Sequence, residues 1–194
     1  MRIASRHRRG RGTDRGATLV EAALSSVLVM TVLFGVLEFG LAFKDYLSMA
    51  SAVRDGARTA STMGNATLAD YDIIQDVIKR MPAVNTNQIQ AIVVFKGASS
   101  TATISTACQT ASVSGSCNFY GPTDIIRPST DFTGTGTAPD RYWAPSTRKD
   151  TLSGPPDYVG VWVKIYHGGI TSLLHLSKSY SDQTLMRIEP ATIS

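Results

Sequence analysis

One long apolar segment limits the folds available to this chain more than any other feature. Residues 17–43 form a run of 27 positions in which only Glu21 and Glu38 carry a charge. A bilayer core of about 30 Å requires about 20 helical residues, so this run is long enough to span a membrane. A core helix of a soluble protein rarely stays apolar on all sides over such a length. We therefore predict a transmembrane helix over residues 17–43.

A cleaved secretory signal is the main alternative to a permanent transmembrane helix. Residues 50–52 read Ala-Ser-Ala, which fits the small-residue cleavage site of such a signal. However, charged residues separate this site from the apolar run, and the run exceeds the roughly 7–15 apolar residues of a signal. Gly64 and Asn65 are expected to end the helix that contains this run. We therefore predict one continuous helix over residues 17–62, of which residues 44–62 extend beyond the membrane.

The positive charge of the chain is concentrated before the apolar segment. Residues 1–16 contain six arginines and one acid, for a net charge of +5, whereas the remaining residues have a net charge of −1. Positive residues beside the first apolar helix hold that end in the cytoplasm. This predicts a cytoplasmic leader over residues 1–16 and an extracytoplasmic domain over residues 63–194. A basic arm can also bind nucleic acid, but the rest of the chain has no basic face, and we expect no nucleic-acid partner.

Glu21 is the unusual residue of the apolar segment. An acid near the end of a spanning helix costs free energy unless it is paired. Glu21 is the fifth residue after Gly16, counting Ala17 as the first. If a peptidase cleaves after Gly16, the new amino terminus lies about one helical turn from Glu21. Its positive charge can then neutralise a Glu21 carboxylate on a neighbouring subunit, and this contact would set the register of a filament.

Two stretches of this segment resemble known proteins. RGATLVEAAL, which contains Gly16 and Glu21, resembles the processing site of type IV pilins and pseudopilins. The following stretch, VLEFGLAFKDYLSMASAVRDGARTAS, resembles the TadE-like family of the tight-adherence (Tad or Flp) pilus system. That family has an E-x-G motif and then an A-x-R-x-G-A-R block, which is formed here by Ala52, Arg54, Gly56, Ala57 and Arg58. The resemblance is dense over residues 15–61, weaker over residues 184–190 and absent from residues 63–156.

The resemblance implies a minor pilin or pseudopilin of a Tad pilus. A prepilin peptidase would cleave between Gly16 and Ala17, and the partners would be other pilin or pseudopilin subunits, the Tad assembly machinery and membrane lipid. The location would be the bacterial cytoplasmic membrane, with the domain outside, or a pilus outside the cell. Arg54 and Arg58 lie four residues apart and share a helical face. They either form a solvated surface or meet acidic residues of an adjacent subunit.

The rest of the chain predicts a small α+β domain. Asp70 is placed to cap a helix over residues 71–80, which Pro82 ends. Three segments read as strands: 88–96, 158–167 and 183–189. In the second, Val159, Val161, Val163 and Ile165 alternate with other residues, so we predict that one face of that strand is buried. A short helix or loop is expected over residues 170–176. Three antiparallel strands against the outer half of the long helix give a pilin-like arrangement.

Residues 97–157 differ in composition from the rest of the domain. Gly, Ser, Thr and Pro supply 32 of these 61 residues, which is too little apolar surface for a separate core. We predict loops and a weak hairpin over residues 102–106. Cys108 and Cys117 are the only cysteines, and on the outer side of a membrane we expect them to form a disulfide. The aromatic pairs at 119–120 and 142–143 either pack on the sheet or form an exposed binding patch.

Catalytic motifs are not recognisable in this sequence. His167 and His175 lie eight residues apart without a paired acid or cysteine, and we interpret them as structural or exposed residues. We therefore predict no enzyme activity, no metal, no cofactor and no small-molecule substrate; a membrane-tethered hydrolase would require a catalytic group that we do not find. The alternative to a processed pilin is an uncleaved single-pass anchor that carries a binding module in the envelope.

Overall fold

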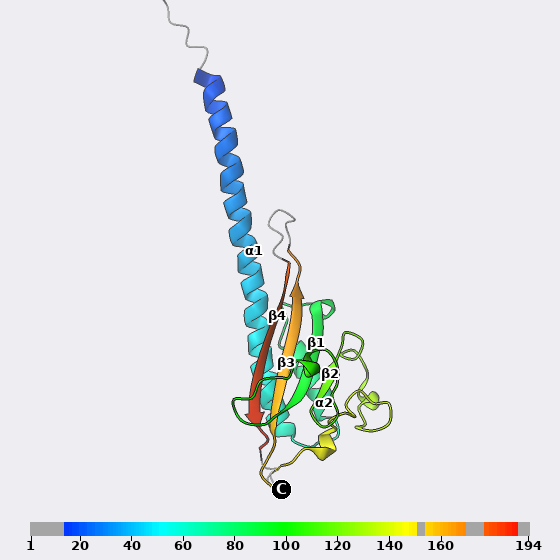
Figure 1. Ribbon diagram of the computed structural model, residues 1–194. Coiled ribbons are helices and arrows are strands. Elements are labelled where there is room, and N and C mark those ends of the chain that lie inside the picture. The colour runs from blue at the N-terminus through cyan, green and yellow to red at the C-terminus, as the bar shows by residue number, and fades with distance from the viewer. Residues whose placement is uncertain (1–13, 151–153, 170–176, 190–194) are drawn as a thin grey trace, which may run out of the picture.

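The computed structural model describes residues 14–150, 154–169 and 177–189, and it places a small mixed domain on one end of a very long helix (Figure 1). The helices are α1 (Asp14–Met63) and α2 (Ala69–Lys79). The strands are β1 (Ile89–Gly97), β2 (Cys117–Tyr120), β3 (Tyr158–His167) and β4 (Lys178–Arg187). Four short 3₁₀ turns lie in the connections. The predicted α+β fold is confirmed, with four strands in place of about three.

Helix α1 is continuous from the apolar segment into the folded domain. Its 50 residues agree with the expected helix over 17–62 to within three residues at either end. Gly64 follows the helix with a φ of 54°, a left-handed conformation that glycine adopts at little cost and that commonly ends helices. The helix therefore ends where the sequence predicts, because both its continuation and its stop are local properties of the chain.

The four strands form one antiparallel sheet in the order β2-β1-β3-β4. Strand β4 pairs with β3 along its whole length, from Tyr158 opposite Arg187 to His167 opposite Lys178. It therefore begins five residues before the predicted strand over 183–189, because backbone pairing with β3 extends it through polar residues. Strand β2 lies in the segment predicted as loops. The hairpin expected at 102–106 does not form; the strand starts at the second cysteine instead.

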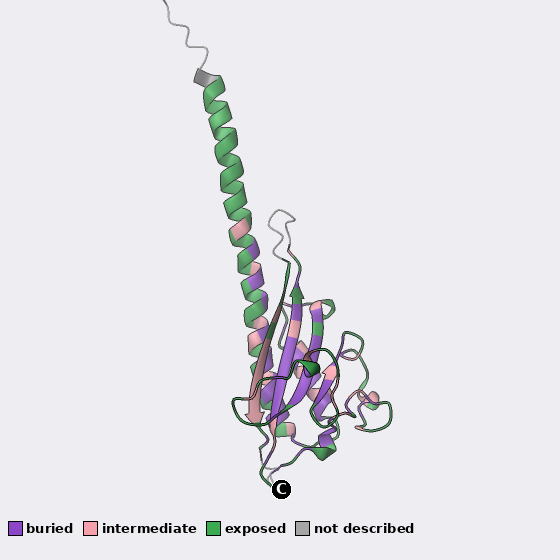
Figure 2. Cartoon of the chain, viewed as in Figure 1, coloured by how far each residue is buried: buried purple, intermediate pink, exposed green. Residues whose placement is uncertain are grey.

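One face of the sheet packs on the two helices and forms the main core (Figure 2). The buried side chains of this core come from the outer half of α1, from α2 and from alternate positions of β1 and β3 (Met49, Val53, Ile73, Val77, Ile92, Val94, Val161 and Val163). In Figure 2 the exposed part of α1 gives way to buried positions only where the helix reaches the sheet. The core thus uses less than half of the long helix.

The opposite face of the sheet is also covered. Val93, Phe95 and Trp162 form a second cluster with the bonded pair Cys108 and Cys117. The prediction that β3 has only one buried face was therefore wrong for its central residues. A disulfide-closed loop covers the side that alternation alone assigns to solvent, since Trp162 packs under it.

Asp70 does not cap α2 and instead lies buried in its first turn. The N-cap is Leu68, which makes no side-chain capping bond. The Asp70 carboxylate accepts hydrogen bonds from Asn118 Nδ2 at 2.8 Å and Tyr120 Oη at 2.5 Å, and it pairs with Arg148. The predicted cap was wrong because the side chain has partners in β2 and in the distant loop that satisfy it better than nearby backbone amides.

Three of the four aromatic residues in these pairs pack against the domain, whereas Tyr142 is partly exposed and contacts Arg141. Tyr120 and Trp143 are buried in the main core, and Phe119 packs on the second cluster. This confirms packing rather than an exposed aromatic patch for these positions. The segment predicted as a short helix or loop over 170–176, which includes His175, lies outside the described residues.

Candidate assembly and membrane surface

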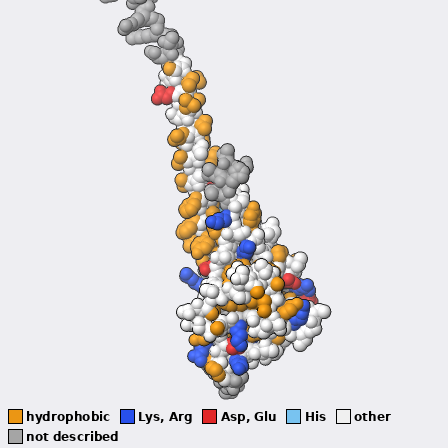
Figure 3. All heavy atoms as spheres, in the orientation of Figure 1, with side chains coloured by type: hydrophobic (Ala, Val, Ile, Leu, Met, Phe, Trp, Pro, Cys, Tyr) orange, Lys and Arg blue, Asp and Glu red, His pale blue; other side chains and the backbone are white. Residues whose placement is uncertain are grey.

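The first part of α1 makes a stem that stands clear of the folded domain. All residues from Gly16 to Phe34 are exposed, including the large apolar side chains (Leu19, Val20, Leu24, Val27, Leu28, Val29, Met30, Val32, Leu33 and Phe34). Figure 3 shows hydrophobic side chains at intervals along this stem, with an acidic side chain near its upper end. Within the described residues, this is the one helix that is long and apolar enough to cross a membrane. Such a surface is unfavourable in water and requires lipid or other helices to cover it.

The polar groups of the stem are few. Ser26 and Thr31 donate their hydroxyls to the carbonyls of Ala23 and Val27, so both are satisfied within the helix. Glu21 is exposed on the stem, one turn from Ala17. Gly16 lies inside α1, and an added Cβ there would meet nothing within 4 Å. The structure thus places the predicted processing site and acid on the same exposed end of the helix.

The buried face of α1 begins at Glu38, which is only 2% exposed. Ala42, Asp45 and Met49 continue this face at helical spacing, and all three are buried. Asp45 Oδ2 lies 2.8 Å from His167 Nδ1 at the end of β3. His167 is therefore a structural residue, as predicted, and it joins the helix to the sheet at the end of the domain that is nearest the stem.

The far end of α1 is held by close packing and backbone contacts. A Cβ added to Gly56 would lie 2.4 Å from Val77 Cγ2, so this glycine lets α1 approach α2 closely. Ser61 Oγ donates to the Arg187 carbonyl at 2.6 Å, and Glu189 N donates to the Ser61 carbonyl at 3.0 Å. These contacts fix the angle at which the stem leaves the domain.

Arg54 and Arg58 lie on the uncovered side of this packed half of α1. Both are exposed, and no ion pair joins either of them to another residue in the described ranges. The neighbouring Asp55 is engaged by Arg80 at 3.2 Å, and Arg80 also pairs with Asp76. The two arginines therefore present unneutralised positive charge beside an ion-pair network that is already complete.

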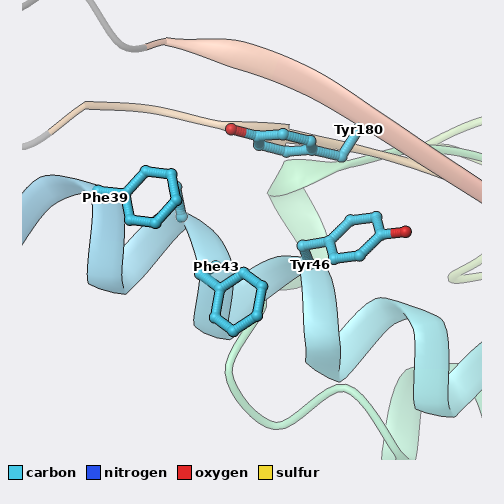
Figure 4. A pocket seen from close by; sticks show the side chains of 5 residues that line it. Phe39, Phe43, Tyr46 and Tyr180 are labelled. Atoms are coloured by element: carbon cyan, nitrogen blue, oxygen red, sulfur yellow. The ribbon is translucent and has the colours of Figure 1, made fainter.

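An apolar groove opens where the stem meets the domain (Figure 4). It has a volume of about 270 Å³ and is lined by Phe39, Ala42, Phe43 and Tyr46 from α1 and by Tyr180 from β4. The rings of Phe39 and Phe43 stack with centroids 6.3 Å apart, and Tyr46 meets Tyr180 edge to face at 6.1 Å. Sequence reasoning missed this groove because Tyr180 lies outside the strand that it predicted.

Sequence reasoning also missed a buried polar cluster around Asp70, inside the domain. Asn118 connects Asp70 to Trp143, since its amide donates to the Trp143 carbonyl at 2.9 Å and accepts from the Trp143 N–H at 2.8 Å. The Arg148 guanidinium lies 4.5 Å from the centre of the Trp143 ring. Burial, reinforced by the Asp70 carboxylate, raises the pKa of Tyr120 well above its ordinary value. Each of these side chains contacts another member of the cluster, although Arg148 Nε and Nη1 are buried without a hydrogen-bond partner. The mutual contacts favour a structural role over a catalytic one.

The chemistry available elsewhere in the described ranges is limited. They contain no group of three or more His, Cys, Asp or Glu residues that could hold a metal ion. Cys108 and Cys117 are joined as predicted. A polar hollow of about 340 Å³ between residues 127 and 139 is lined mainly by threonine hydroxyls, and its Arg127 is paired with Asp124 and Asp131. This hollow contains no nucleophile paired with a base.

Comparison with known proteins gives a match in the part of the chain that contains the stem and the two exposed arginines of α1. The model of a family described as TadE-like protein matches residues 16–58, from the start of the stem to Arg58. This match confirms the resemblance to the TadE-like family over residues 16–58. It includes none of the sheet. No curated protein and no solved structure matches the chain significantly.

Proposed function

We propose that this protein is a TadE-like minor pilin or pseudopilin of a Tad (Flp) pilus, made as a membrane precursor. Residues 1–16 form the cytoplasmic leader, residues 17–43 span the membrane, residues 44–62 extend the helix, and residues 63–194 form the domain outside. A prepilin peptidase removes the leader between Gly16 and Ala17. The processed subunit then joins other pilin or pseudopilin subunits and the Tad machinery.

The observation that carries this proposal is the exposed apolar stem within the TadE-like match. The match begins at Gly16 and runs through the stem into the packed half of α1. The stem makes no buried surface with its own domain before residue 38. A helix of this kind can be covered by lipid in a precursor and by neighbouring helices in a filament, and a pilin subunit requires both states.

The charge distribution and the disulfide support the proposed orientation of α1 in the membrane. The six arginines before the stem favour retention of that end in the cytoplasm. The disulfide between Cys108 and Cys117 lies in the domain at the other end of α1, and disulfides persist outside the cytoplasm. Glu21 then lies near the cytoplasmic end of the span, where a new amino terminus on a neighbouring subunit can pair with it.

The first experiment is to determine the amino terminus and intact mass of the membrane-extracted protein, with and without the peptidase. The proposal predicts a start at Ala17 that depends on the peptidase. A start at Met1 in both samples would contradict processing and favour the uncleaved, membrane-anchored binding module. A start at Val53 would identify a secreted domain and would contradict the transmembrane assignment of α1.

The role of Glu21 is tested separately by Glu21→Gln, with Ser25→Ala as the matched control on the same exposed stem. Insertion of both variants into the membrane should equal that of the wild type. Pilus assembly should fall only in Glu21→Gln, because the carboxylate can no longer pair with the amino terminus of a neighbour. Normal piliation of Glu21→Gln would contradict the proposed contact.

A further inference from the structure

We infer that the end of the folded domain nearest the stem rests in the headgroup layer of the membrane, and that its aromatic groove holds the upper part of a phospholipid chain. The aromatic groove is the one lined by Phe39, Ala42, Phe43, Tyr46 and Tyr180. The inference rests on the membrane span proposed above but not on leader cleavage or pilus assembly.

The length of the stem places the domain at the membrane surface. A hydrocarbon core of about 30 Å takes up about 20 helical residues, and counted from Ala17 these end near Val36. The buried face of α1 begins two residues later, at Glu38. Almost no helix is therefore left between the hydrocarbon and the folded domain. At about 1.5 Å per residue, Phe39 to Tyr46 lie within about 15 Å of the hydrocarbon boundary.

The side chains at this level have the chemistry of a membrane interface. Phe39 and Phe43 are 69% and 52% exposed, which is unfavourable in water for two neighbouring rings. Tyr46 and Tyr180 add rings that each carry a hydroxyl, and such amphipathic aromatics concentrate at the headgroup level. Figure 4 shows Phe39 and Phe43 on the helix and Tyr180 across from them on β4. The groove is therefore open to an acyl chain along its apolar floor.

The sheet contributes to the same surface. Tyr180 pairs with Ile165 and Lys178 pairs with His167, so the start of β4 and the end of β3 lie together at the end of the domain nearest the stem. Lys178 is exposed there, and Tyr166 is 43% exposed. Lys44 is exposed next to Phe43 on α1. Two cations beside an aromatic groove complement the phosphate of an anionic phospholipid.

Lipid is favoured over a second protein copy by the continuity of the apolar surface. The exposed apolar residues of the stem run through Val36 and Leu37 into Phe39 and Phe43, and the intervening Glu38 is buried on the other side of the helix, so it does not interrupt this surface. The lipid that covers the stem therefore extends directly into the groove. A second copy would require its own apolar segment at the same depth, and this outcome is separated in the experiment below.

The test uses the full chain with one introduced thiol, since Cys108 and Cys117 are bonded to each other and the described residues contain no free cysteine. Ser179→Cys places the thiol next to Tyr180 in the chain, at the same end of the sheet but on its opposite face. Ser99→Cys places it after β1 at the other end of the sheet; both serines are exposed. Each variant is labelled with bimane and reconstituted in phosphatidylcholine–phosphatidylglycerol vesicles. A lipid with a nitroxide near its headgroup serves as quencher, and flotation with the vesicles is measured first.

The inference predicts strong quenching at residue 179, little quenching at residue 99, and weaker quenching at 179 when Phe43→Ser is added. Equal and weak quenching at both positions in floated protein would overturn it while leaving the membrane span intact. Failure to float would overturn the span and this inference together. Two observations together would instead assign the groove to a second copy of the chain. These are quenching at residue 179 that disappears when the protein is diluted with lipid, and energy transfer between labelled copies. A normal amino terminus at Ala17 is compatible with either result, so the proposed function is judged independently.

Discussion

Asp70 and Arg148 form an ion pair in which neither side chain is exposed, although they lie 78 residues apart in the chain. Asn118 and Tyr120 supply two further hydrogen bonds to the same carboxylate. The pair connects α2 to the Gly-, Ser- and Thr-rich segment that follows β1. A segment with little apolar surface is thus fixed on the domain by one buried polar cluster together with its few aromatic residues.

Replacing Asp70 with alanine should destabilise the domain strongly. It leaves the Arg148 guanidinium buried without its countercharge, and loss of one partner from a buried pair costs about 3–5 kcal/mol. Asp72→Ala, in the same turn but half-exposed, should cost less than about 1 kcal/mol. Urea unfolding in detergent, followed by near-ultraviolet circular dichroism, measures both. Equal small effects would show that the pair is not the anchor of the segment.

The double variant Asp70→Ala, Arg148→Met tests whether the charges of these two residues are coupled. Removing both charges avoids an unpaired ion, so the double variant should be more stable than Asp70→Ala alone. It should remain below the wild type, because Asn118 and Tyr120 lose their acceptor. A double variant as unstable as the sum of the two single variants would contradict coupling between these residues.

The domain should lose stability at alkaline pH through Tyr120. Burial raises the pKa of Tyr120 above its ordinary value of 10.0, so the folded state keeps the proton that the unfolded state releases. The free energy of unfolding should therefore fall as pH rises above 10, by up to about 1.4 kcal/mol per pH unit. Tyr120→Phe should be less stable at pH 8 but should show a shallower alkaline slope. Identical slopes from pH 8 to 11 would contradict this assignment.

Gly56→Ala should weaken the contact between the two helices. The added Cβ would lie 2.4 Å from Val77 Cγ2, and overpacking of this kind costs about 1–3 kcal/mol. Gly40→Ala is the matched control, because nothing lies within 4 Å of its added Cβ and alanine favours a helix. Thermal unfolding should show a loss for the first and none for the second. Adding Val77→Ala should restore part of the loss if the clash is its cause.

Removing the disulfide should destabilise the cover of the second sheet face. Cys108→Ser with Cys117→Ser opens a loop with a sequence separation of 9. Chain entropy predicts a cost of about 2–3 kcal/mol for a loop of this size. Hydrogen exchange should increase first in residues near Trp162 and Phe95, which pack under the loop. Unchanged exchange at these residues would contradict a covering role for the disulfide.

Charge reversal at Arg54 and Arg58 should lower pilus assembly without unfolding the domain. Both side chains are exposed, so Arg54→Glu with Arg58→Glu changes surface charge and not the core. If the pair meets acidic residues of a neighbouring subunit, like charges then oppose each other in the filament. Lys79→Glu, an exposed cation on α2, is the control. Full assembly of the double variant would favour the solvated interpretation of this face.

The sequence is most informative where structure depends on neighbours along the chain. Helix α1 follows from an uninterrupted apolar run and from Gly64, which ends it. Strand β3 matches residues 158–167 as predicted, because alternation of apolar residues is a local pattern. The disulfide also follows from the sequence, since the chain has only two cysteines. In each case the deciding residues lie close together, and no distant partner changes the outcome.

Tertiary structure decided the features that need partners from distant segments. Asp70 has the spacing of a helix cap, but residues 48 to 78 positions away make it a buried acceptor. Strand β2 forms because β1 offers an edge, and β4 starts early because β3 extends beside it. The aromatic groove exists only because Tyr180 is brought to the helix at Tyr46. Local pattern determines which segments form helices and strands, whereas packing determines which of their side chains come together to form a surface.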